Sequence, residues 1–266
     1  MTVDGLLSAL EGAIARHASA IVAYSGGIDS ALIAVVAHRV LGERMLAVTS
    51  TSASLAPTER EAAIAFAAEH GLPHRLIETR ELDNPAYAAN NADRCYHCKS
   101  TLYADLAAIA RAEGYATLLN GTNADDLGDY RPGLQAASES GVASPFLEVG
   151  MTKAQVRELA RHLGLAIWDK PAAACLASRL PYGTPVTLEV LDQVARAELV
   201  LAQAGFLGAR VRHHGDLARI EVRPDDLEAA FAYRARLTAD LKALGYCYVT
   251  LDLEGYRVGS LNASLT

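Results

Sequence analysis

A glycine-rich segment at residues 25–30 carries the most specific chemistry in this sequence. It follows a short apolar stretch, residues 20–24, and an apolar helical pattern continues from it to about residue 40. The glycines allow a sharp turn and bring backbone N–H groups close to an anion, while the following helix adds the positive end of its dipole. The pattern predicts a pyrophosphate site whose members are Ser25, Gly26, Gly27, Asp29 and Ser30.

The residue types within this segment indicate different roles. Ser25 and Ser30 offer hydroxyl donors, and Asp29 can act through a magnesium ion or orient the loop. The segment is not a Walker A motif, because no Gly-Lys-Ser or Gly-Lys-Thr follows. A glycine-rich turn that binds nothing is the alternative, but the full string after a buried strand is far more specific than a lone Gly-Gly.

Two of the four cysteines form a Cys-x-x-Cys pair. Cys95 and Cys98 stand at the start of a predicted helix, where both sulfurs can reach one metal ion. The helix end, with Arg94 and Lys99 beside the pair, favours the thiolate form. Such a pair fits a redox couple, half of a zinc site or part of an iron–sulfur site. Cys247 lies between two tyrosines in a strand pattern, and we expect it to pack in or near the core.

Cys175 is the candidate for a third functional thiol. It lies in a loop rich in proline and alanine, with Ser178 and Arg179 close by. A small buried residue among alanines is the alternative. A closed zinc site requires four protein ligands, whereas a [4Fe–4S] cluster on three thiolates leaves one iron open to sulfide or substrate. We therefore prefer a cluster held by Cys95, Cys98 and Cys175.

Charged residues on two predicted strands could bind an anionic group. Arg210 and Arg212 alternate on one strand, so both face the same side and can clamp a phosphate. Glu221 on the neighbouring strand could orient one arginine. A solvated charged sheet face is the alternative for this trio. We expect His213 and His214 at packing or rim positions.

A second polar loop follows the fourth predicted strand. We assign Gly121, Thr122 and Asp125 to the nucleotide site, because ligands bind at the carboxyl ends of such strands. Asp125 and its neighbour Asp126 could hold magnesium, or they could cap a helix. Lys99 could offset negative charge near the reacting centre, or it could be a surface lysine.

Strands and helices alternate along the first two thirds of the chain. This alternation predicts a parallel, doubly wound α/β sheet with its ligand at the carboxyl ends of the strands. The expected strands are 20–24, 45–49, 74–77 and 117–120, and the expected helices are 3–17, 28–40, 57–69, 99–113 and 152–163.

A stretch rich in proline, glycine and alanine, residues 170–185, indicates a domain boundary. We expect a nucleotide domain over residues 1–178 and a smaller α+β domain over residues 179–266 for substrate binding or oligomerisation. The elements expected in the smaller domain are helices 188–203 and 224–244 and strands 209–213, 218–222, 246–251 and 257–260.

The composition excludes several classes of function. The 266 residues carry a net charge of −7, which argues against a large nucleic-acid surface. Asp4 and Glu11 interrupt any apolar run near the N-terminus, and the longest apolar stretch, residues 31–37, is too short to span a bilayer. We therefore expect a cytoplasmic protein with neither a membrane nor a nucleic-acid partner.

Several of these segments together resemble the LarE family, the ATP-dependent sulfur transferases that help make the nickel-pincer nucleotide cofactor of lactate racemase. The string at residues 25–30 resembles the SGGxDS signature of the wider PP-loop ATP pyrophosphatases. More discriminating are residues 121–126 with 129–133, 174–179 with 181–183, and 209–214 with 220–222. The resemblance covers nearly the whole chain in order.

The resemblance implies a reaction and its cofactors. ATP, with Mg²⁺, would transfer AMP to a carboxylate of pyridinium-3,5-biscarboxylic acid mononucleotide, and sulfur would displace AMP to give a thiocarboxylate. In some members the cysteine matching Cys175 gives up its sulfur; in others it joins a Cys-x-x-Cys pair to hold a [4Fe–4S] cluster that carries sulfide. Cys95 and Cys98 match the second pattern. The resemblance implies catalytic roles for Cys175, Cys95 and Cys98 and a homo-oligomer, and it leaves the sulfide source open. In addition, we assign Lys99 to catalysis and Arg179, Arg210, Arg212 and Glu221 to substrate binding.

Three other functions share part of this pattern. A tRNA-thiolating PP-loop enzyme uses the same ATP chemistry, but the negative charge and the absence of a basic tail argue against it. An amidotransferase-like synthetase, such as those making NAD or GMP, would not explain the three cysteines. A nucleotide-binding module without catalysis is the third alternative.

Overall fold

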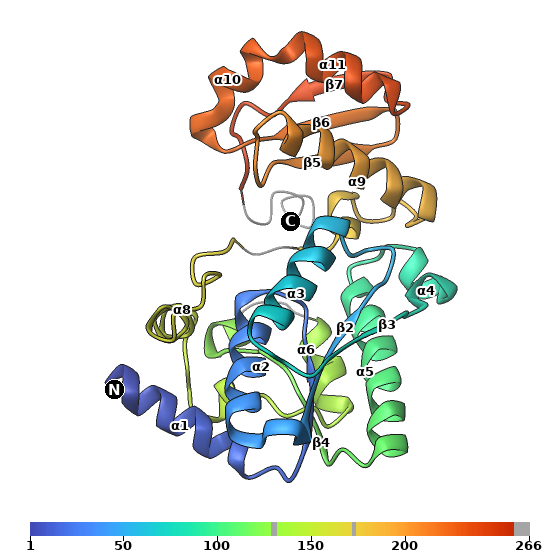
Figure 1. Ribbon diagram of the computed structural model, residues 1–266. Helices are drawn as coiled ribbons and strands as arrows, with labels where there is room; N and C mark the ends of the chain where they lie inside the picture. The colour runs from blue at the N-terminus through green and yellow to red at the C-terminus, as the bar shows by residue number, and fades with distance from the viewer. Residues whose placement is uncertain (129–131, 172–173, 258–266) are drawn as a thin grey trace. The chain divides into compact units, whose positions relative to one another are not determined.

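The computed structural model describes residues 1–128, 132–171 and 174–257 (Figure 1). The chain divides into two compact units, the first formed by Met1–Tyr87 and Asp93–Ala173 and the second by Ala88–Ala92 and Ala174–Thr266. From the sequence we expected the division after residue 178. The second unit includes the chain from Ala174 onward, and Cys175 and Ser178 therefore belong to it. Among the described helices, none is long and apolar enough to cross a membrane.

The first unit contains a parallel sheet of four strands in the order β3-β2-β1-β4. The expected parallel α/β sheet is therefore confirmed. Its strands are β1 (Ala20–Ala23), β2 (Met45–Ser50), β3 (His74–Ile77) and β4 (Thr117–Leu119). The helices around it are α1 (Val3–Ala15), α2 (Ile28–Leu41), α3 (Pro57–Glu69), α4 (Pro85–Ala88), α5 (Arg94–Glu113), α6 (Pro132–Glu139), α7 (Pro145–Glu148) and α8 (Lys153–His162).

Helices cover both faces of this sheet (Figure 1). Alternate strand residues point to opposite faces, so Val22 packs in one apolar core and Ile21 in another. The first core includes residues of α1, α2, α3 and α8, and the second includes residues of α5 and α6. The strands β2 and β3 are added on one side of β1, and β4 is added on its other side. The position between β1 and β4 is therefore a topological switch point, where ligands of open α/β sheets bind.

The second unit is a sheet of three strands with helices. Its order is β5-β6-β7, with β5 (Arg210–His214) antiparallel to β6 (Leu217–Glu221) and β7 (Tyr248–Leu251) parallel to β6. One face packs Val211, Ala218 and Ile220 against apolar helix residues. The helical elements are η4 (Leu176–Arg179), α9 (Leu188–Gln203), η5 (Pro224–Asp226), α10 (Leu227–Ala232) and α11 (Arg234–Ala243).

A short segment from the middle of the first unit completes the second. Asn90 is fully buried and donates its side-chain N–H groups to the carbonyls of Pro181 and Thr184, at 2.8 Å each. Gly183 N donates to the Asn90 carbonyl at 2.9 Å. Asn90 adopts a left-handed backbone with φ of 56°, which asparagine tolerates better than most residues. No sequence motif indicated this long-range contact.

Three expectations for the second unit need correction. The helix expected over 224–244 is divided at Tyr233, where ψ is 4° and the ring packs against Phe206. Cys247 is exposed and not in the core, because the strand begins only at Tyr248 and the buried tyrosine before it takes the core position. Of the strand expected over 257–260, Arg257 is not in a strand, and residues 258–260 lie outside the described residues.

The burial of His213 predicts that the folding stability of the second unit falls at acidic pH. The His213 ring is buried, 3.2 Å from the Tyr246 hydroxyl, and burial lowers its pKa. The unfolded chain therefore binds more protons below the ordinary histidine pKa of about 6.5, and folding stability falls as the pH drops through that value. In His213→Phe, urea unfolding measured from about pH 8 to about pH 5 will show a smaller loss of stability than wild type. Equal slopes in wild type and His213→Phe would contradict the prediction.

Candidate active site

The glycine-rich segment forms the turn between β1 and α2. Gly26 has φ of 75°, and a Cβ there would lie 2.8 Å from the Cβ of Ala63 in α3. The position therefore requires glycine for both backbone and space. Gly27 is the N-cap of α2, so the first N–H groups of the helix point out of the turn without intrahelical acceptors. This is the backbone arrangement that binds phosphates.

The two serines of the segment brace the turn. Ser30 is buried, and its hydroxyl donates to the Gly27 carbonyl at 3.0 Å. The same oxygen accepts from the Ser25 N–H at 3.1 Å and lies 3.1 Å from the Ser25 hydroxyl. Ser30 therefore shapes the loop from inside, whereas Ser25 is exposed at its surface.

Asp29 is held by two residues from other parts of the first unit. One carboxylate oxygen forms an ion pair with Lys153, and the other accepts from the side-chain amide of Asn123 at 3.3 Å. The backbone N–H of Lys153 donates to the Asp125 carboxylate at 2.9 Å. Three segments distant in sequence therefore meet at the start of α2.

The loop after β4 approaches α2 at backbone distance. A Cβ at Gly121 would lie 2.7 Å from the Asp29 carbonyl carbon and 2.8 Å from the Ser30 nitrogen. Thr122 N donates to the Asn120 side chain at 3.1 Å. The Asp126 carboxylate accepts from the backbone N–H of Asn123 at 2.9 Å. Asp125 and Asp126 thus each accept a backbone N–H, which is the capping role that we considered as the alternative to magnesium binding.

Lys170 adds a second cation at the loop. Its Nζ donates to the Gly26 carbonyl at 3.2 Å and to the Glu59 carboxylate at 2.7 Å. Arg157 in α8 fixes the segment by donating to the carbonyls of Trp168 and Lys170. The loop that is rich in N–H donors therefore also has two lysines beside it.

Cys95 and Cys98 both lie in the first turns of α5, with Cys95 exposed and Cys98 half-buried. The Tyr96 hydroxyl donates to Glu139 at 2.6 Å and ties this end of α5 to α6. Half-buried Lys99 packs near Gly133, where a Cβ would lie 3.1 Å from the lysine Cγ. Residues 129–131, which belong to one of the motifs that carry the family resemblance, lie outside the described residues.

Cys175 belongs to the second unit, whereas Cys95 and Cys98 belong to the first. Among the described residues, no three His, Cys, Asp or Glu side chains gather as potential metal ligands.

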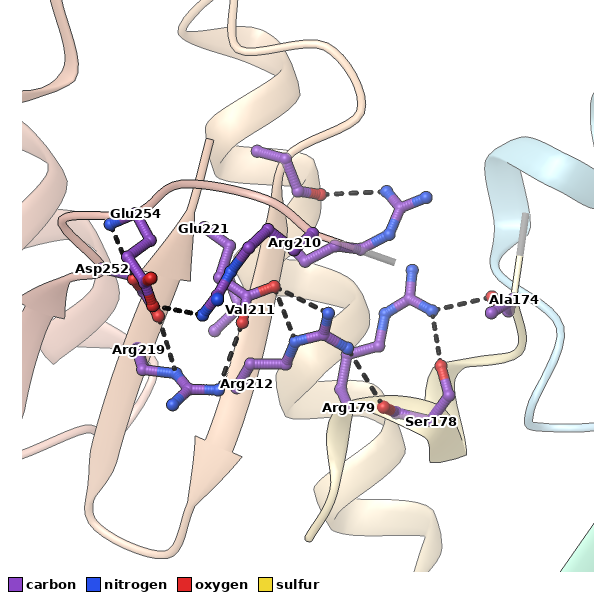
Figure 2. Close-up of polar contacts among 12 residues, drawn as sticks. Ala174, Ser178, Arg179, Arg210, Val211, Arg212, Arg219, Glu221, Asp252 and Glu254 are labelled. Atoms are coloured by element: carbon purple, nitrogen blue, oxygen red, sulfur yellow. Dashed lines mark hydrogen bonds and ion pairs between the residues drawn. The ribbon is translucent and has the colours of Figure 1, made fainter. Parts of the chain in front are cut away.

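In the second unit, Arg179 is buried beside Cys175 and makes five hydrogen bonds with described residues. Figure 2 shows those to Ala174 and Ser178. Its Nε and Nη2 donate to the two oxygens of Glu198 at 2.8 and 3.0 Å. Its Nη1 donates to the Ala174 and Cys175 carbonyls at 2.7 and 3.0 Å and lies 2.9 Å from the Ser178 hydroxyl. This guanidinium, predicted to bind substrate, is already bonded to the protein and only 3% exposed.

Glu221 holds two arginines on the face of the sheet opposite the apolar core (Figure 2). It is fully buried and accepts from Arg212 at 2.9 and 2.6 Å and from Arg219 at 3.1 Å. Arg212 also donates to the Ser178 carbonyl at 3.1 Å. The predicted contact of Glu221 with an arginine is present, and this part of the face is not solvated.

Arg210 differs from its neighbours. Within the described part of the chain it bonds only the carbonyls of Gly208 and Ala209, and its guanidinium stacks 5.5 Å from the centre of the Tyr256 ring. Burial and the positive charge of Arg179 lower its pKa. The Arg210 guanidinium is thus partly desolvated and has no carboxylate partner among the described residues, so an anion can pair with it.

Sequence reasoning missed Asn123, Lys153, Lys170 and Glu198. Two of them carried a signal. Lys153 is the first residue of a helix, where the dipole disfavours a cation, so its charge must be used elsewhere. Glu198 lies in the buried stripe of α9, four residues after Val194 and three before Leu201, and a buried carboxylate requires a partner.

The fold and the loop define an ATP-using enzyme of the PP-loop class. The family model for NAD synthase matches residues 3–114. The chain is 47% identical to an uncharacterized protein of Synechocystis sp., over 93% of each chain. It is 27% identical to the tRNA-specific 2-thiouridylase of Rickettsia felis, over 59% of this chain and 53% of that protein.

A more specific match decides the family. The chain is 39% identical to the pyridinium-3,5-bisthiocarboxylic acid mononucleotide synthase of Lactiplantibacillus plantarum, over 92% of this chain and 89% of that protein. The chain belongs to the family of that synthase, which confirms the predicted resemblance.

The close approach at Gly121 predicts a strong effect of one methyl group. In Gly121→Ala the Cβ meets the backbone of α2, which cannot give way as a flexible side chain could. We expect a loss of about 1–3 kcal/mol in urea unfolding, typical of overpacking, and weaker ATP binding by calorimetry because Asp29 moves. Gly12→Ala, which has open space, is the control and should not weaken ATP binding. Unchanged ATP affinity in Gly121→Ala would contradict the prediction.

Proposed function

We propose that this protein uses ATP to adenylate a carboxylate of pyridinium-3,5-biscarboxylic acid mononucleotide and then replaces the activated oxygen with sulfur. The observation that carries the proposal is the convergence of residues 25–30, the loop after β4 and Lys153 at one end of the parallel sheet. Membership of the synthase family supports the choice of substrate.

The first step is adenylation in the first unit. A carboxylate oxygen of the substrate attacks the α-phosphorus of ATP, the bond to the bridging oxygen breaks, and pyrophosphate leaves. The N–H groups at the start of α2 and the charges of Lys153 and Lys170 would stabilise the departing pyrophosphate. Asp29 and Asp125 would hold Mg²⁺, which supplies further positive charge at the phosphates.

The second unit would bind the phosphate of the substrate. Arg210 is the arginine of the cluster whose guanidinium has carbonyl partners and no carboxylate partner among the described residues. An arriving phosphate would relieve the repulsion that Arg179 exerts on it. Arg179, Arg212 and Glu221, which we first predicted to touch the substrate, would then act by holding the strand and the Cys175 loop in place.

Sulfur insertion completes the reaction. A sulfur nucleophile attacks the acyl carbon and AMP leaves with the electron pair, a far easier departure than that of oxide. Cys175 can provide that sulfur itself: after acyl transfer, loss of its Cα proton would break the Cβ–Sγ bond and leave dehydroalanine.

Alternatively, the three cysteines can hold a [4Fe–4S] cluster. Thiolates are the ligands such clusters use, and Cys95 and Cys98 lie in the first turns of one helix. Cys175 would be the third ligand. When bound, the cluster would supply a transferable sulfide at its open iron. We propose this form, in a cytoplasmic homo-oligomer without a nucleic-acid partner.

The order of steps can be tested with purified protein. Wild type given ATP, Mg²⁺ and the pyridinium substrate should release pyrophosphate and form thiocarboxylate. Cys175→Ala should still release pyrophosphate but form no thiocarboxylate, because adenylation precedes the sulfur step; mass spectrometry and a pyrophosphate assay distinguish the two. Cys247→Ala should behave as wild type. Pyrophosphate release that depends on tRNA instead of the pyridinium compound would overturn the proposal in favour of the tRNA-thiolating alternative.

The source of sulfur needs a separate test. Wild type isolated without oxygen should contain iron and sulfide and absorb visible light, and Cys95→Ala should lose all three because one thiolate ligand is gone. A colourless, iron-free wild type that acquires dehydroalanine at position 175 during turnover would rule out the cluster and identify Cys175 as the sulfur donor.

A further inference from the structure

The backbone around Cys175 is held on both sides of its side chain. The peptide carbonyl before it, from Ala174, accepts from Arg179 Nη1 at 2.7 Å. The carbonyl after it, from Cys175 itself, accepts from Arg179 Nη1 at 3.0 Å, from the Ser178 hydroxyl at 2.7 Å and from the Ser178 N–H at 2.9 Å. Both peptide units that flank the thiol are therefore tied to one guanidinium.

That guanidinium is itself fixed by a carboxylate from α9. Glu198 binds Arg179 in a bidentate, side-on pair at 2.8 and 3.0 Å. The planar fork of arginine allows one side to face a carboxylate while the remaining nitrogen reaches the two carbonyls, a geometry that lysine cannot reproduce. The orientation of Arg179, and with it the Cys175 backbone, depends on Glu198.

The same carboxylate also fixes the arginine strand. Glu198 Oε1 accepts from the Val211 N–H at 3.1 Å, between Arg210 and Arg212. A second link runs from Arg212 to the Ser178 carbonyl at 3.1 Å (Figure 2). Glu198 therefore sets the separation between the loop that carries Cys175 and the strand that carries Arg210.

We infer that Glu198 and Arg179 are a pair of positioning residues that hold the Cys175 thiol at a fixed distance from the phosphate-binding arginine. The inference rests on the proposed function, and assigns Glu198 a role that the sequence motifs did not reveal. Fixing both groups on one unit keeps Cys175, as cluster ligand or as sulfur donor, at a set distance from the bound substrate, which matters because small displacements of reacting groups slow reactions strongly. The pair itself touches no reacting atom.

The reactivity of the thiol reports this role without relying on activity. In the reduced, metal-free full-length protein, alkylation of Cys175 by iodoacetamide is followed by peptide mass spectrometry, with exposed Cys247 as internal reference. Glu198→Gln and Arg179→Lys should each raise the Cys175 rate about tenfold relative to Cys247, because the loop opens more often. Both should lower kcat for thiocarboxylate formation while the KM for ATP stays unchanged.

Controls separate positioning from folding. Asp192→Asn removes an exposed ion pair with Arg196 on the same helix. It should change neither the alkylation rate of Cys175 nor the kcat for thiocarboxylate formation. If Glu198→Gln fails to fold by circular dichroism, Ser178→Ala carries the test: it removes the hydroxyl donor to the Cys175 carbonyl but leaves the ion pair, and should raise alkylation about threefold.

The outcomes are distinct. Wild-type alkylation rates in folded Arg179→Lys and Ser178→Ala would overturn the inference, as would faster alkylation with unchanged kcat. If wild type itself forms no thiocarboxylate, the proposed function fails, and the alkylation rates then show only whether the pair fixes the loop.

Discussion

Holding positive charge in place for an anionic ligand is the constraint on which the rest of this structure depends. Cations that are to meet phosphates repel one another and cannot be buried unpaired. Both units solve this with carboxylates: Lys153 is paired with Asp29 and Lys170 with Glu59 in the first, and Arg179 with Glu198 and Arg212 with Glu221 in the second. Among the described residues, Arg210 has carbonyl groups and no carboxylate as hydrogen-bond partners. These pairs tie the loops and strands that carry the cations to neighbouring elements.

The charge pairs also explain why so many motif residues do not face solvent. Ser30 bonds within its own turn, Arg179 spans a loop and a helix, and Glu221 is enclosed by arginines. A motif of this family therefore combines residues that contact ligands with residues that hold those contacts in place. Sequence similarity alone does not distinguish the two groups, because both are required for the same geometry.

Much of the fold could be predicted from the sequence, because local patterns determined it. The helices at Pro57–Glu69 and Leu188–Gln203 and the strand at His74–Ile77 have the predicted ends. What local patterns do not contain is the identity of distant partners: Lys153 with Asp29, Glu198 with Val211, and Asn90 with Pro181 join residues from separate elements. The candidate site was therefore predictable in its glycine-rich turn and arginines, but not in the side chains that fix them.

The passage of residues 88–92 through the second unit has an evolutionary consequence. A gene fusion or exchange that replaced everything after residue 173 would bring in a new second unit but keep the old Asn90, whose buried amide is matched to the carbonyls of Pro181 and Thr184. Such a chimera would leave buried polar groups unpaired. The two units are thus expected to be inherited together, and new specificity in this lineage to arise by point changes within them rather than by shuffling of modules.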